Sequence, residues 1–112
     1  MMESVDNESA WAIDREGRPY GLRVVLPKCT YVLPWAQFLY AEGAADRVHA
    51  VFSMHDVVVT GCRLDALLAD IAAQVVTVLR QPSRADAFRN APGPRVSAIE
   101  VRPIEGKVRA GD

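Results

Sequence analysis

The sequence predicts an α+β domain: a curled antiparallel sheet or partly open small barrel of about six short strands, with one main helix near residues 64–74 and a short helix near 84–89. Three observations predict this fold class. Several short runs alternate apolar and polar residues between turn residues, as half-buried strands do. After Gly61 the spacing of apolar residues lengthens from two to about 3.6, the period of an α-helix. A chain of 112 residues, half of them apolar, is long enough for one domain with its own core.

The N-terminal part predicts a β-hairpin. Trp11 and Ile13 form the first apolar pair, and residues 14–17 have the composition of a turn. Leu22, Val24 and Leu26 then alternate along a strand that ends at Pro27. We expect the chain to form one domain over residues 1–112. Because both ends are polar, we expect residues 1–9 and 106–112 to be loosely ordered.

The segment CTYVLPWAQFLYAEG allows two interpretations. We favour a short turn over residues 34–37 followed by a strand from Phe38 to Ala41. Alternatively, Pro34 opens a helix that Gly43 closes. The aromatic residues of this segment fit core packing at the edge of the sheet, although Trp35 and Tyr40 are also candidates to line a ligand cleft.

The segment HAVFSMHDVVVTG predicts a second hairpin. Large apolar residues change from even to odd positions within it, and a single straight strand would place half of them on the wrong face. A two-residue loop at Met54 and His55 resolves the conflict, with Phe52 opposite Val57 and His49 opposite Thr60. A β-bulge near residues 54–56 is the alternative.

The C-terminal half predicts helix, strand, short helix and strand. Apolar residues recur at helical spacing from Leu64, with Cys62 or Thr60 as the cap: Leu64, Leu67, Leu68, Ile71 and Val75. Residues 75–79 are rich in β-branched side chains and favour a strand. A capping box at Ser83 and Asp86 indicates the helix near 84–89. Residues 96–104 form a last strand with Ile99 and Val101 facing the core. Pleckstrin-homology and Sm folds are similar to this in general architecture.

Composition indicates a cytoplasmic protein. The net charge of -1 gives no general attraction to nucleic acid or to anionic lipid, so neither is an expected partner. The chain has no secretory signal pattern and no apolar run that is long enough to span a membrane. Its two cysteines make no disulfide framework, and its Ala-, Arg- and Val-rich composition suggests a bacterial source.

Candidate chemistry is confined to Cys62 and His49. In the predicted register His49 is the diagonal neighbour of Cys62, which lies near a helix N-terminus, so the two are a possible nucleophile and base. No glycine-rich loop or other oxyanion-binding segment accompanies them. The spacing of His, Cys and Asp matches no metal site, and no phosphate-binding glycine motif occurs, so we expect no metal and no cofactor.

The leading functional hypothesis is a non-enzymatic binding or assembly module that associates with itself or with another protein. Val51 and Val58 place apolar area on the second face of the hairpin and are the candidate interface. Residues 1–79 carry six basic and ten acidic side chains, whereas residues 80–109 carry seven and three, so two copies have opposite charges to pair. The alternative hypothesis is a small ligand-binding domain or enzyme that uses Cys62 and His49.

Overall fold

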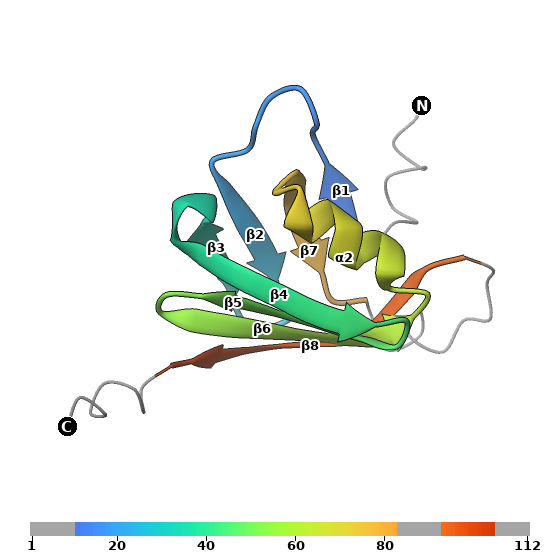
Figure 1. The fold of residues 1–112 in the computed structure, drawn as a ribbon. Helices are drawn as coiled ribbons and strands as arrows, with labels where there is room; N and C mark the ends of the chain where they lie inside the picture. Colours follow the sequence, from blue (N-terminus) through green and yellow to red (C-terminus); the bar gives the residue numbers. More distant parts are fainter. Residues whose placement is uncertain (1–10, 83–92, 105–112) are drawn as a thin grey trace, which may run out of the picture.

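A computed structural model describes residues 11–82 and 93–104, which form a mostly-β α+β fold (Figure 1). Two four-stranded sheets, one helix and one 3-10 turn make up this part of the chain. In chain order the elements are β1 (Trp11–Ile13), β2 (Gly21–Val25), β3 (Thr30–Pro34), the 3-10 turn η1 (Trp35–Gln37), β4 (Phe38–Ala44), β5 (Arg47–Phe52), β6 (His55–Cys62), α2 (Asp65–Ala72), β7 (Val76–Arg80) and β8 (Arg95–Pro103).

The first sheet is mixed and has the order β1-β7-β2-β3. β2 and β3 form a hairpin in which Leu22 lies opposite Leu33, whereas β7 joins β2 in parallel. The predicted N-terminal hairpin is therefore wrong, because β7 lies between β1 and β2. The predicted turn after β1 is present: Asp14 Oδ1 accepts hydrogen bonds from the backbone N–H groups of Glu16 and Gly17, at 3.1 and 2.7 Å.

The second sheet is antiparallel and has the order β4-β5-β6-β8. The turn and strand predicted after Pro34 are confirmed as η1 and β4. The β5–β6 hairpin is also confirmed, but its loop is Ser53 and Met54. Ala50 consequently lies opposite Val57 and His49 opposite Val58, a register two residues away from the predicted one. A shift of two residues leaves every side chain on its predicted face.

Helix α2 and the first sheet lie on the same side of the second sheet, and the core fills the space between them (Figure 1). α2 packs against β4 and β5. Leu64, Leu67 and Ile71 are buried as their spacing predicts. The helix is shorter than predicted, since Gln74 has a φ of 59° and Val75 lies beyond its end. The residue before it is Leu64, which makes no capping hydrogen bond, so the predicted cap by Cys62 or Thr60 is wrong.

The barrel prediction is wrong for the described part of the chain. Eight strands form two separate sheets there, where about six strands in one curled sheet or barrel were expected. β7 and β8 confirm the strands predicted over residues 75–79 and 96–104. The predicted helix near 84–89 and the predicted loose ends, 1–9 and 106–112, lie outside the described residues. Within residues 11–82 and 93–104, no helix has the length and apolar character needed to cross a membrane.

Candidate functional site

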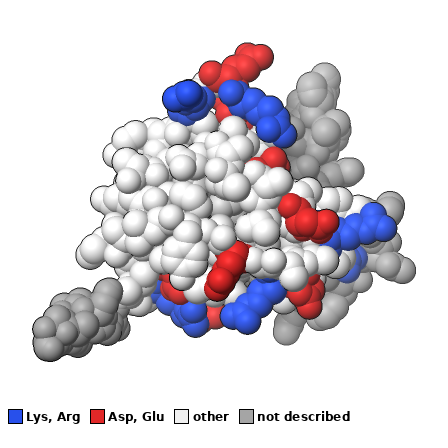
Figure 2. Space-filling model, in the orientation of Figure 1, with Lys and Arg blue, Asp and Glu red and all other residues white. Residues whose placement is uncertain are grey.

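The outer face of the second sheet, which points away from α2, carries a network of charged side chains. The pairing of the strands produces it: Glu42 lies opposite His49, His49 opposite Val58, and Asp56 opposite Arg102. Because side chains on one face alternate along each strand, these residues share the solvent side of the sheet. Figure 2 shows charged side chains gathered along this lower edge of the molecule.

Asp56 is the centre of this network. His49 Nε2 lies 2.6 Å from Asp56 Oδ2, and Arg102 Nη2 donates to the same oxygen at 2.9 Å. On the other side of the imidazole ring, Glu42 Oε2 lies 3.8 Å from His49 Nδ1. Only 14% of the Asp56 side chain is exposed. The carboxylate thus links three strands through one histidine and one arginine.

The surroundings of Asp56 favour its ionised form. Burial raises its pKa, but the hydrogen bonds and positive charges of Arg102 and His49 outweigh that effect, and the net pKa is lowered. Asp56 in turn raises the pKa of Arg102 through the same hydrogen bond and its negative charge. A carboxylate held ionised in this way fixes the orientation of the histidine, as the acidic member of a catalytic triad does.

Cys62 does not lie beside His49. It is exposed, and it lies four residues along β6 from Val58, the residue opposite His49. Four residues of a strand span about 13 Å, which is too far for a thiol to donate its proton to the imidazole. The register behind the proposed pair is wrong, and the structure brings His49 to Asp56 instead.

His55 also differs from its predicted position. The predicted two-residue loop contained His55, but in the structure this residue is the first of β6 and is half-buried. Its ring meets the ring of Tyr31 edge-on, with a centroid distance of 5.6 Å. His55 therefore joins the start of β6 to β3 in the first sheet.

Trp35 and Tyr40, the candidate cleft residues, lie on different sides of the second sheet. Trp35 is 5% exposed and packs in the core, where its ring centroid lies 5.3 Å from that of Phe38 and 5.5 Å from that of Phe52. Its Nε1 donates to the carbonyl oxygen of Val76 at 3.1 Å. Tyr40 is 51% exposed and lies opposite Val51 on the outer face. The two residues line no common cleft.

Val51 and Val58, the candidate interface residues, lie in the middle of the outer face. They are 8% and 7% exposed, because the larger side chains of the network surround them. Exposed apolar area lies nearby instead, at Leu39 and Met54, which are each 62% exposed. Sequence reasoning missed these residues, although Leu39 directly follows Phe38 and Met54 belongs to the loop predicted for the hairpin.

Among the described residues, no group of three or more His, Cys, Asp or Glu side chains is arranged to hold a metal ion. The comparisons with known proteins give no further guide to the chemistry of this site. No family model matches the chain, and neither the curated proteins nor the solved structures include a significant match.

The Asp56 network predicts a specific pH dependence of stability. The pKa of Asp56 is lower in the folded state than the unfolded value of about 3.9, so its contribution is present above that pH and is lost as the pH falls through the folded value. We expect Asp56→Asn to lower the free energy of unfolding by about 2 kcal/mol at pH 7 and by much less near pH 2. Urea unfolding at both pH values measures this difference.

A matched control is Asp46→Asn, which removes an exposed carboxylate from the β4–β5 turn. We expect it to change the free energy of unfolding by less than about 0.5 kcal/mol at either pH. An Asp56→Asn variant with the same loss at pH 2 as at pH 7 would show that ionisation of Asp56 contributes nothing to stability.

Proposed function

We propose that this protein is a non-enzymatic binding module that associates with a second copy of itself. The surface that we assign to this contact is the β4 patch, defined by Leu39, Tyr40 and Met54. These side chains are 62%, 51% and 62% exposed, and they are large and apolar or aromatic. Exposed apolar groups that lie together on an otherwise polar surface mark interaction sites.

Backbone geometry brings the members of the β4 patch to one end of the second sheet. Phe38 pairs with Phe52, and a register shift follows between Phe38 and Tyr40, so that Leu39 is the extra residue of a bulge. The backbone N–H of Ser53 donates to the carbonyl oxygen of Gln37 at 2.9 Å, which holds the β5–β6 loop beside the start of β4. Met54 in that loop is therefore a neighbour of the bulge.

A second copy suits this surface because β4 is an edge strand. In the described part of the chain β4 has a sheet neighbour on one side only. An antiparallel pair of identical edge strands is two-fold symmetric, which is the commonest symmetry of homo-oligomers. The net charge of -1 opposes such a pairing only weakly. In Figure 2 the surface in front of β2 and the first half of β4 carries no charged side chain that would require desolvation.

The size of the contact sets the expected affinity. A standard interface covers about 800 Å² on each partner. Three side chains cover less than the standard area, so the paired strand edges must contribute the rest. We therefore expect a dimer that dissociates in the micromolar range.

The proposal is tested by measuring mass as a function of concentration with light scattering and native mass spectrometry. Leu39→Lys and Met54→Lys are each expected to weaken the dimer by about tenfold or more, because each buries an amine in the contact. Ile13→Lys is the control, since Ile13 is an exposed apolar residue on β1, in the other sheet. A wild-type protein that stays monomeric at millimolar concentration would overturn the proposal, as would a dimer that neither β4 patch variant weakens.

A further inference from the structure

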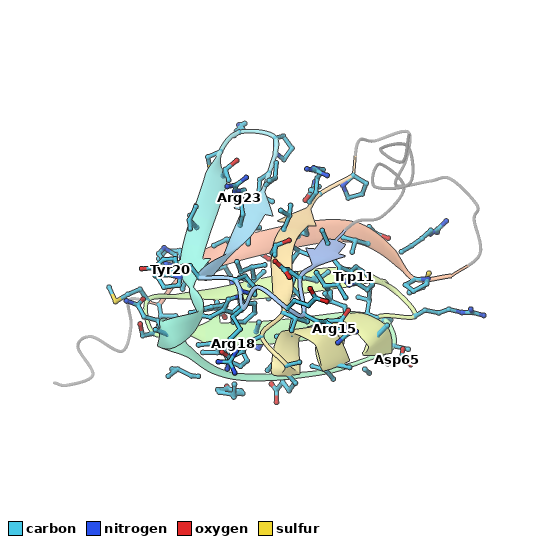
Figure 3. The ribbon with its side chains drawn as sticks, turned by 90° about the horizontal axis from the view of Figure 1, so that it is seen from above. Trp11, Arg15, Arg18, Tyr20, Arg23 and Asp65 are labelled. Carbon is cyan, nitrogen blue, oxygen red and sulfur yellow. The ribbon has the colours of Figure 1, made fainter. Side chains whose placement is uncertain are left out.

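The outer face of the first sheet contains a half-open hollow of about 360 Å³. Its lining comes from β2, β3, β7 and the residue before β2: Tyr20, Gly21, Arg23, Val32, Thr77 and Val78. Arg23 occupies its centre, because it lies opposite Val32 on β3 and opposite Val78 on β7. Figure 3 shows Arg23 on the β2–β3 hairpin and Tyr20 near the start of β2, both away from α2. None of its lining residues belongs to the β4 patch or to the Asp56 network.

Two polar side chains on the strands that line the hollow are Thr77 and Arg23. Thr77 Oγ1 donates to the carbonyl oxygen of Ala12 at 3.2 Å and is thus engaged within the sheet. Arg23 forms no ion pair with any residue in 11–82 or 93–104. An arginine guanidinium is a cation whose planar set of N–H donors matches a carboxylate in a bidentate pair. Among the described residues that line it, Arg23 is exposed and gives the hollow one positive charge.

The rest of the lining is apolar or aromatic. Val32 is 59% exposed and Tyr20 is 78% exposed. A ligand that covers these two side chains removes their apolar area from water, which favours binding. A charge beside two valines and a tyrosine ring fits a ligand with one anionic group and a small hydrocarbon part.

We propose that this hollow binds a small apolar carboxylate. The guanidinium of Arg23 holds the carboxylate, and Val32, Val78 and Tyr20 contact the hydrocarbon part of the ligand. A carboxylate fits better than a phosphate, since phosphate sites use several converging donors or a helix N-terminus, and this hollow has a single arginine on a sheet. Because the hollow is half open, we expect a dissociation constant in the millimolar range.

The test is a titration of the ¹⁵N-labelled protein with benzoate, followed by amide chemical shifts. Saturable shifts are expected at Arg23, Val32 and Val78, and benzamide, which lacks the charge, is expected to bind about tenfold more weakly. Arg23→Gln is expected to lose benzoate binding to the same extent. Arg47→Gln, which removes an exposed arginine from β5 in the other sheet, is expected to keep it.

The outcomes separate a built site from a general attraction between an anion and the protein. Shifts that do not saturate, equal binding of benzamide, or unchanged binding by Arg23→Gln would each overturn the proposal. The spectrum of Arg23→Gln also reports whether the variant is folded, so a loss of binding is not confused with unfolding.

A parallel titration with an acetylated dipeptide ending in a free phenylalanine carboxylate identifies the source of the carboxylate. Tighter binding than that of benzoate indicates a chain terminus, and equal or weaker binding indicates a free small molecule.

Discussion

Trp35→Ala is expected to lower the free energy of unfolding by about 4 kcal/mol, the range measured when a buried aromatic side chain is truncated. Trp35 is 5% exposed and belongs to the core cluster that both sheets and α2 share. Its ring packs against Phe38 and Phe52 of the second sheet. Removing it leaves a cavity where η1 turns the chain from the first sheet into the second.

A second cost of Trp35→Ala comes from the first sheet. Trp35 Nε1 donates to the carbonyl oxygen of Val76, a residue that is 0% exposed. Without the indole, that oxygen loses a partner in a buried place, which costs about 1–3 kcal/mol when no water replaces it. Domains of this size have about 5–15 kcal/mol of stability in total, so the variant should be close to unfolding at 37 °C.

Trp35→Phe separates the two contributions. It keeps most of the ring volume but removes the donor, so we expect a loss of about 1–2 kcal/mol. Urea unfolding followed by far-UV circular dichroism measures both variants without relying on tryptophan fluorescence. A loss below about 1 kcal/mol in Trp35→Ala would contradict the assignment of this residue to the shared core.

The sequence predicted the faces of the β5–β6 hairpin but could not predict its register. Val48, Ala50, Val57 and Val59 all face the core as expected, since burial follows the period of two. A loop at residues 53 and 54 and a loop at 54 and 55 give registers that differ by two residues and satisfy the same pattern. Neither loop contains the Asn-Gly or Gly-Gly pair that would decide between them.

The candidate site was missed for the same reason. With the predicted register, His49 lies opposite Thr60 and points toward Cys62. With the observed register, it lies opposite Val58, and the neighbour within reach is Asp56. Arg102 joins from β8, more than forty residues further along the chain. The alternation of apolar and polar residues along 96–104 places Arg102 on the outward face. It does not indicate which strand pairs with this one in the sheet.

The strand order of the first sheet depends on the pairing of β7 with β1 and β2, which the pattern of apolar and polar residues does not predict. Turn residues between β1 and β2 predict a hairpin, because consecutive strands usually pair. Here β7 is placed between them, with Trp11 opposite Leu79 and Arg23 opposite Val78. A hydrogen bond between β1 and α2 also holds β1 in this position: Trp11 Nε1 donates to Asp70 Oδ2 at 3.0 Å. In Figure 3, Trp11 accordingly lies above α2.

Gly61→Ala is expected to cost at least about 2 kcal/mol, although it adds one methyl group. Gly61 lies at the register shift between β6 and β8, next to the point where the sequence changes from strand to helix period. A Cβ atom at this position would lie 2.0 Å from the carbonyl oxygen of Arg95 and 3.0 Å from the Cα of Val96. Both are backbone atoms, so no side-chain rotation relieves the contact, and β8 must move away from β6.

Gly17→Ala is the matched control, because it makes the same chemical change and has the same effect on the entropy of the unfolded chain. A Cβ atom there meets Asp14 Oδ2, which lies at the end of a side chain that can rotate. We expect a loss of at most about 1 kcal/mol, from the hydrogen bonds that Asp14 makes to the turn. Urea unfolding of both variants gives the comparison. If Gly61→Ala cost no more than Gly17→Ala, β8 would pair less closely with the end of β6 than the structure has it, because a backbone contact of that length cannot be accommodated without a shift of the strand.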